Sequence, residues 1–304
     1  MEAAKSSNPM ARRQAALDLG ESRNPAAVAT LEALLTDAQP SVRAAACEAL
    51  GTLRSRSSVP KLATVLSGDV DPRVRQVAAL AFVYIGDPAA TGPLIGALRD
   101  GAVPVRHAAI RALGKLRAAG AVGPLSAALS DPDPMARKIV VSSLGEIGSK
   151  EGVPALSSAL SDTDAGVRGE AAKSLGLIGD AGARPALTNA LKDADAGVRV
   201  QAADALARTG DLSGLPAVYA ALKSPDATAR QRAASTVGLV GDAKGLSALV
   251  AARAVEKNAA AQAMMDFELA RIRSRLGAPA KTPAKAAPVK PVKTKKAIVP
   301  KETR

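Results

Sequence analysis

The sequence predicts an all-α protein in which two-helix units stack into an elongated solenoid. Three observations predict this fold class. A unit of about 31 residues recurs eight times, and such a period is typical of stacked repeats that cannot bury their apolar sides alone. Of the 304 residues, 47% are hydrophobic but only 1% are aromatic, so Ala, Leu and Val must fill the interior. Helix-start and helix-stop residues also recur at fixed offsets in most units.

Each unit carries an arginine after a small apolar residue, and this arginine serves as the reference position: Arg12, Arg43, Arg75, Arg106, Arg137, Arg168, Arg199 and Arg230. In six units an aspartate lies six residues earlier: Asp37, Asp69, Asp100, Asp131, Asp162 and Asp193. Ser6 and Ser224 take its place in the first and eighth units. Such regular spacing favours a structural role. We therefore predict a ladder in which these side chains bond to backbone groups and to each other across successive units.

The second helix of each unit is predicted to begin just before the arginine. A cap-type side chain lies four residues ahead of it in six units: Asn8, Asp71, Asp133, Asp164, Asp195 and Asp226. Proline often follows, and Pro at the first helical position needs no hydrogen-bond partner for its nitrogen. The inward face follows the helical period, as in Val167, Ala171, Ala172, Leu175 and Ile178. Glycine ends the helix at Gly86, Gly148, Gly179, Gly210 and Gly241.

The next helix along the chain opens twelve residues after the arginine. Its cap-type residues are Asn24, Ser55, Asp87, Ser149, Asp180, Asp211 and Asp242, and Ala118 alone breaks the series. Leucines four residues apart then form an inward stripe, as in Leu156 and Leu160. Cys47, the single cysteine, falls where Ile110 and Val141 lie in other units. We therefore expect it to be a small buried residue.

The two ends of the chain depart from the pattern. The first unit leaves only Met1–Ser7 for its first helix, so either this half-unit is the native cap or the natural chain begins upstream. Residues 245–276 are predicted to form two capping helices that lack the Asp and Arg anchors. Their inward stripe consists of Met265, Leu269, Ile272 and Leu276. Residues 1–276 then form the solenoid. Residues 277–304 carry a net charge of +7 out of +13 and are rich in Lys, Pro and Ala, which predicts a disordered basic tail.

The pattern D-x-x-x-x-V-R-x-x-A-A-x-A-L-G-x-I-G-D resembles HEAT repeats of the short type, as in phycobilisome bilin lyases, over roughly residues 5–250. The resemblance implies a right-handed α-solenoid whose second helices line the concave side. The resemblance also suggests a role as a bilin-lyase-like chaperone or enzyme subunit, and this remains an alternative. The paired His-Glu motifs of deoxyhypusine hydroxylase do not carry over, because Ala108 follows His107, the only histidine. The tryptophans of HEAT-like DNA glycosylases are absent as well.

The variable positions of each unit lie on the second helix, at offsets of one, five and nine residues from the arginine. These positions face away from the core and hence toward the concave side. In the fourth unit all three are basic: His107, Arg111 and Lys115. Adding the neighbouring rows gives a candidate partner-binding patch of Tyr84, His107, Arg111, Lys115, Lys138, Glu146 and Lys173. Such a patch suits an acidic peptide, a phosphate or nucleic acid. A merely solvated basic face is the alternative interpretation.

No motif predicts a reaction, a metal or a cofactor. The sequence shows no phosphate-binding glycine loop, nucleophile–base pair or carboxylate pair, and the single His107 cannot build a metal site alone. We expect a non-enzymatic scaffold that holds an acidic segment of a protein partner on its concave face. The alternatives are a nucleic-acid or polyanion binder that uses the tail, and docking to an anionic lipid surface. We expect no transmembrane segment and no secretory leader, and hence a cytoplasmic protein.

Overall fold

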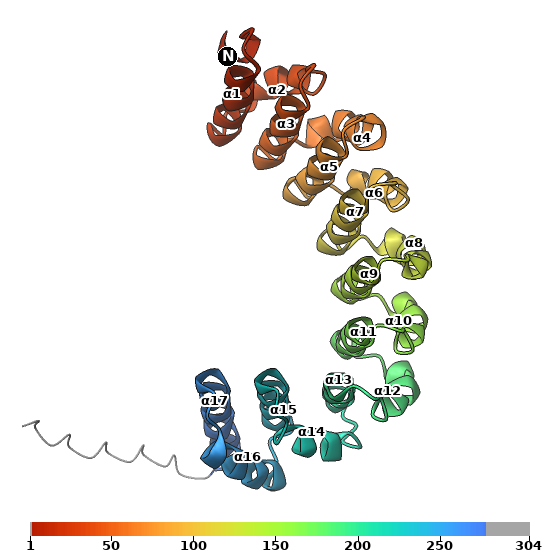
Figure 1. Ribbon diagram of the computed structural model, residues 1–304, viewed down its shortest axis with the longest axis vertical. Coiled ribbons are helices and arrows are strands. Elements are labelled where there is room, and N and C mark those ends of the chain that lie inside the picture. The colour runs from red at the N-terminus through yellow and green to blue at the C-terminus, as the bar shows by residue number, and fades with distance from the viewer. Residues whose placement is uncertain (1, 278–304) are drawn as a thin grey trace, which may run out of the picture.

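The computed structural model describes residues 2–277, and within them the chain forms an arc of stacked helix pairs (Figure 1). The prediction of an all-helical α-solenoid is confirmed. The inner row consists of α1 (Pro9–Glu21), α3 (Pro40–Thr52), α5 (Pro72–Ile85), α7 (Val103–Lys115), α9 (Pro134–Ile147), α11 (Ala165–Ile178), α13 (Ala196–Arg208), α15 (Ala227–Val240) and α17 (Ala259–Arg275). The outer row consists of α2 (Val28–Leu34), α4 (Val59–Gly68), α6 (Thr91–Ala97), α8 (Val122–Ala127), α10 (Val153–Ala159), α12 (Arg184–Ala190), α14 (Leu215–Ala221) and α16 (Ala243–Val255).

The inner helices line the concave side of the arc, and the outer helices cover its convex side (Figure 1). Most outer helices are short because a 3-10 turn of three residues precedes them, as at Pro88–Ala90 before α6. Both rows contribute to the core. Val167, Ala171 and Leu175 from α11 pack with Leu156 and Leu187 from α10 and α12, and all five side chains are fully buried. The core therefore runs along the arc between the two rows.

Helix starts follow the predicted caps with one exception. Asn8, Asp71, Asp133, Asp164, Asp195 and Asp226 each accept a hydrogen bond from a backbone N–H in the first turn of an inner helix. Ser55 takes the N-cap position as predicted, but its side chain does not cap a backbone N–H. Its hydroxyl faces those of Ser57 and Ser58 at 3.2 and 2.8 Å instead of a backbone N–H. Buried beside Ser58, this hydroxyl finds its partners among side chains.

Helix ends explain the recurring glycine. Gly86, Gly148, Gly179, Gly210 and Gly241 all adopt positive φ, between 67° and 80°, in the left-handed region that glycine enters without a steric cost. Three units place an arginine at this position: Arg23, Arg54 and Arg117, with φ of 51°, 52° and 48°. The backbone turn is therefore common to all eight units, although the residue best suited to it occurs in only five.

The Asp and Arg anchors form a ladder that runs unbroken from Arg12 to Asp193. Arg75 is representative: one terminal nitrogen donates to the carbonyl of Asp69 in its own unit, at 2.7 Å. Its other two donors grip both carboxylate oxygens of Asp100 in the next unit, at 2.7 and 2.8 Å. The other inter-unit pairs are Arg12–Asp37, Arg43–Asp69, Arg106–Asp131, Arg137–Asp162 and Arg168–Asp193. Each pair ties one unit to the next through a two-point, charge-assisted contact.

These bonds lower the pKa of all six ladder aspartates below the ordinary value of 3.8. In Asp37, Asp100, Asp162 and Asp193 the hydrogen bond from arginine is the largest cause. In Asp69 and Asp131 burial is the largest single influence and would raise the pKa, but the arginine and a backbone N–H together outweigh it. The ladder therefore holds these carboxylates charged.

The ladder is interrupted at one place. Arg199 reaches the carbonyls of Asp193 and Ala194, but the next unit offers Ser224 instead of an aspartate. The apolar core divides at the same helix, because Val200 and Ala203 of α13 belong to a second cluster, whereas Leu206 belongs to the first. The inner row also turns most sharply between α13 and α15 (Figure 1).

The C-terminal layer follows the repeat more closely than predicted. Glu256 occupies the place of the ladder aspartate and binds Arg230 through both carboxylate oxygens. Six residues later, Gln262 replaces the arginine and donates to the carbonyl of Glu256 at 2.6 Å. The layer lacks the Asp and Arg anchors, as expected, but the longer side chains of Glu256 and Gln262 take the places of both.

Within this layer Met265, Leu269 and Ile272 are buried as predicted. The inward assignment of Leu276 is wrong, because it lies one residue beyond α17 and is 45% exposed. The predicted tail, residues 277–304, falls outside the described residues except for Gly277.

Candidate binding groove on the concave face

The inner helices bring the predicted central residues onto one surface. Arg111 and Lys115 are exposed on α7, Lys138 is partly exposed on α9, and Lys173 is exposed on α11. These helices pack closely because Gly114 faces Ser143 and Gly145 faces Ser174, where a Cβ atom would come within 2.5–2.8 Å of the serine side chains. The Ser143 hydroxyl then donates to the carbonyl of Ile110, at 3.0 Å. Small residues thus set the spacing of the basic side chains.

A hollow of about 420 Å³ lies between α7, α9 and α11. Its lining includes five of the seven predicted residues: Arg111, Lys115, Lys138, Glu146 and Lys173. Met135, Ile139, Ser142, Ser143 and Glu170 complete it. The structure thus brings together most of the patch that the offsets indicated.

The two other predicted residues lie outside this lining. Tyr84 is 65% exposed on α5. The His107 side chain is only 22% exposed, and its Nε2 lies 2.7 Å from Asp133 Oδ2. Asp133 also caps α9, and the N–H of Met135 is the largest cause that lowers its pKa. His107 therefore links α7 to the start of α9.

A second hollow of about 280 Å³ continues the first toward α13 and α15. It is lined by Glu170, Lys173, Leu177, Val200, Gln201, Asp204, Arg208, Arg232, Ser235 and Thr236. Glu170 and Lys173 belong to both hollows, so together the two form one groove across five units. We refer to it as the concave groove.

The carboxylates of the concave groove are all engaged. Glu146 pairs with Lys115 at 2.8 Å, and Glu170 pairs with Lys173 at 2.8 Å. Asp204 binds Arg208 at 2.7 Å. Within the part of the chain that the structure describes, Arg111, Lys138 and Arg232 make no ion pair. The row predicted as wholly basic is thus partly neutralised by its neighbours, and three cations remain for a ligand.

Sequence reasoning missed Glu170, Gln201 and Arg232, which all lie two residues after the reference arginine. The signal was available in the helical period. Successive side chains on a helix are rotated by 100°. The side chain two residues after the arginine therefore points within 20° of the one nine residues after it, whereas the side chain one residue after the arginine points 80° away from it. Accordingly, Gly169 and Val200, at an offset of one, are buried. In these two units the exposed stripe is therefore centred nearer offsets two, five and nine, whereas Ala45, Ala108 and Ile139, at an offset of two in other units, are buried.

The described residues contain no group of three or more His, Cys, Asp or Glu side chains placed to hold a metal ion. Burial raises the pKa of the Cys47 thiol to about 12, which leaves it a protonated core residue. Among residues 2–277, none of the helices has the length and apolar character needed to cross a bilayer.

Solved structures with similar folds are repeat proteins. The Escherichia coli protein YibA is 20% identical, with a TM-score of 0.54 over 88% of this chain and 98% of that one. A chain of the Kap95p–RanGDP complex is 14% identical, with a TM-score of 0.65 over 86% of this chain and 43% of the other. At these identities the likeness shows the fold alone. The complex of CpcE and CpcF of phycocyanin lyase from Nostoc is 25% identical over 78% of this chain and 90% of that one, but its TM-score of 0.44 gives no support to a shared activity.

No curated protein matches the sequence. The family model of HEAT repeats matches residues 1–83, 59–129, 122–198 and 184–265, which together cover most of the chain. The period, the stacked helix pairs and this match agree, and the chain therefore belongs to the family of HEAT-repeat proteins.

Proposed function

We propose that this chain is a non-enzymatic scaffold that holds an acidic segment of a protein partner in the concave groove. One observation carries the proposal: every carboxylate that lines the groove is paired, whereas Arg111, Lys138 and Arg232 are not. The surface is therefore net positive at fixed positions. Carboxylates of a partner could form ion pairs with these three cations without breaking an existing ion pair.

The shape and lining of the groove favour a peptide over a nucleic-acid duplex. Apolar side chains alternate with the charges, and Met135 and Leu177 are more than half exposed there. An extended or helical segment can bury such side chains while its acidic residues meet the cations. No aromatic ring lines either hollow, so bases would find no stacking platform in them.

The test is affinity capture with the full chain and with the double variant Arg111→Glu/Arg232→Glu. Reversing two unpaired cations should weaken capture of a protein partner at least about tenfold, since each change removes an attraction and adds a repulsion. The thermal midpoint should stay unchanged. Arg56→Glu is the matched control, because Arg56 is an exposed arginine in the turn before α4, away from the groove. Equal capture by the double variant and the control would contradict the proposal.

The second candidate is a nucleic-acid or polyanion binder, which the net charge of +7 over residues 277–304 favours. Capture at two salt concentrations, with the full chain and with one ending at residue 276, separates the two. Binding through about five phosphates would make log affinity fall with log salt at a slope near −4.5 and would be lost with the basic segment. A protein partner that survives both changes supports the scaffold.

A further inference from the structure

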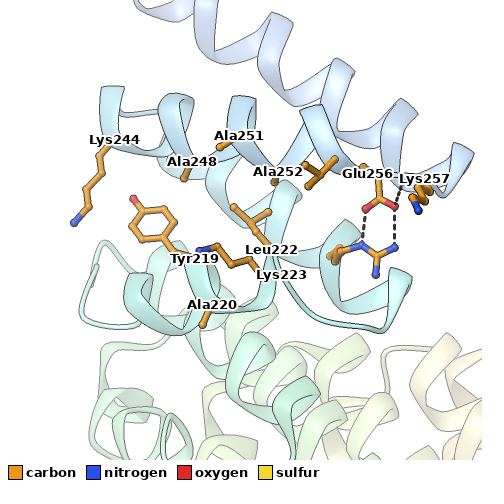
Figure 2. Close-up of a pocket in the computed structure, with 12 residues that line it drawn as sticks. Tyr219, Ala220, Leu222, Lys223, Lys244, Ala248, Ala251, Ala252, Glu256 and Lys257 are labelled. Atoms are coloured by element: carbon orange, nitrogen blue, oxygen red, sulfur yellow. Dashed lines mark hydrogen bonds and ion pairs between the residues drawn. The ribbon is translucent and has the colours of Figure 1, made fainter.

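A second groove lies on the opposite side of the solenoid, between outer helices α14 and α16. Figure 2 shows its lining, which encloses about 800 Å³. The floor and walls are largely apolar: Tyr219, Ala220, Leu222, Ala248, Ala251, Ala252 and Val255. Val255 is 77% exposed at one end, so a large apolar side chain is left uncovered there. We refer to this site as the outer groove.

The outer groove owes its length to α16. Helix α16 has 13 residues, whereas the other outer helices of the described chain have six to ten. At 1.5 Å per residue, it forms a wall about 20 Å long. Alanines dominate the part of α16 that faces the groove, so the wall is smooth and low. A ligand that lies along α16 would contact it for about three to four helical turns.

The unpaired charges that line the outer groove are all positive. Lys223, Lys244 and Lys257 stand on its rim, and none of them makes an ion pair within residues 2–277. Glu256 is the only acidic residue of the lining, and both of its carboxylate oxygens are held by Arg230. Figure 2 shows Glu256 at the end of the groove opposite Lys244. A ligand therefore meets an apolar floor between unpaired cations.

The hydroxyl of Tyr219 is a second, independent observation, because it is enclosed and has no hydrogen-bond partner in the described residues. The Tyr219 side chain points from α14 toward α16 (Figure 2). Burial raises the pKa of this phenol, so the hydroxyl keeps its proton and can donate. Lys244 lies 5.5 Å from the ring centroid and places a positive charge beside it. The charge of Asp242 also acts on the phenol and is the second cause of its raised pKa, so the hydroxyl is a donor without a partner between charges of both signs.

We propose that the outer groove binds an amphipathic helical segment of another protein, with apolar residues on one face and Asp or Glu at its edges. Helices that dock in grooves use apolar anchors spaced over two to three turns, which matches the wall of α16. The chain's own C-terminal segment has the wrong sign, since residues 277–304 hold seven Lys and one Arg against one Glu. Because this face is opposite the concave groove, the chain would bridge two partners, and the inference does not depend on the first.

The experiment selects peptides of about 14 residues, long enough to span about 20 Å as a helix, from a random display library on the immobilised full chain. Enriched peptides should combine apolar residues at helical spacing with acidic residues. Their affinity should fall about tenfold for Lys244→Glu/Lys257→Glu, because two exposed attractions become repulsions. It should not change for Arg111→Glu/Arg232→Glu, which tests the concave groove instead.

Tyrosine variants give the sharper readout. Tyr219→Phe removes a hydroxyl that has no partner in the protein, so it should not lower the thermal midpoint, but it should weaken peptide binding about fivefold. Tyr84→Phe, at the exposed tyrosine of α5, should change neither. Enrichment of peptides without acidic residues, or binding insensitive to both outer-groove variants, overturns the proposal. So does binding of phosphatidylcholine–phosphatidylserine vesicles that the lysine variant abolishes while no peptide is enriched.

Discussion

At the scale of single residues, Ser224 keeps every ladder contact except the carboxylate. Its hydroxyl accepts the N–H of Asp226 at 3.2 Å, as the ladder aspartates accept the N–H two residues ahead of them. Its carbonyl accepts from Arg230 at 2.7 Å. The backbone is therefore already placed for an aspartate, and Arg199 lacks only the partner that the other ladder arginines have.

We predict that Ser224→Asp completes the ladder and stabilises the chain by about 1 kcal/mol, since a partly exposed two-point ion pair replaces a hydroxyl. The measurement is the thermal or urea midpoint. Ser6→Asp is the matched control, because Ser6 makes the same local bonds but no arginine of a preceding unit is described there. If both variants shift the midpoint equally, the gain comes from local capping, and the proposed pairing with Arg199 is wrong.

At the scale of elements, the inner helices of all eight units end in the same backbone conformation, although the local sequence does not favour it in every unit. Arg23, Arg54 and Arg117 sit in the left-handed conformation that the other five units give to glycine. For a residue with a Cβ atom this conformation costs roughly 1 kcal/mol. The cooperative stack imposes the turn, because the following outer helix must return along its neighbours.

Arg117→Gly should therefore raise the free energy of unfolding by about 1 kcal/mol, because glycine relieves the steric cost and the arginine side chain is exposed. Gly179→Ala should lower it by a similar amount at the equivalent position, where φ is 70°. Urea unfolding of the two variants beside the parent chain checks both signs. Destabilisation by Arg117→Gly would show that this arginine makes a contact that outweighs its strained backbone.

At the scale of the whole molecule, the ladder makes stability depend on acid. Each ladder aspartate has a pKa below 3.8, so its contribution is fully present above that pH and is lost as the pH falls through the lower, folded value. Glu256 extends the pH range over which stability is lost. The hydrogen bond from Arg230, followed by that from the N–H of Asn258, lowers the pKa of Glu256 from 4.5 to about 2. Glu268 acts in the opposite sense, since burial raises its pKa and its contribution declines as the pH rises above 4.5.

We predict that the thermal midpoint of Glu256→Gln lies below that of the parent at neutral pH and that the two converge between pH 4.5 and about 2. The reason is that protonation of Glu256 removes the same charge as the substitution. Melting curves at a series of pH values check this. A gap that stays constant down to pH 2 would mean that shape, and not charge, makes Glu256 stabilising.

Most of the fold and part of the site were open to prediction because their signals are local. The caps, the glycine turns, the buried stripes and Cys47 each follow from residues within a single unit. Arg111, Lys115, Lys138 and Lys173 were placed on one surface for the same reason. The ion pairs that neutralise part of this surface were not predicted, because Lys115 meets Glu146 from another unit, 31 residues away.

The sequence by itself determined the repeat, its helices and the face that most residues present, since helical period and capping act over a few residues. Only the tertiary structure decided which aspartate each arginine grips, that Glu256 and Gln262 replace the anchors, and that cations gather along two grooves. The physical reason is that all these contacts cross between units. They depend on how far one layer rotates and shifts against the next. Close contacts such as that of Gly114 with Ser143 set this geometry between α7 and α9, and the division of the apolar core at α13 changes it toward the C-terminal layers.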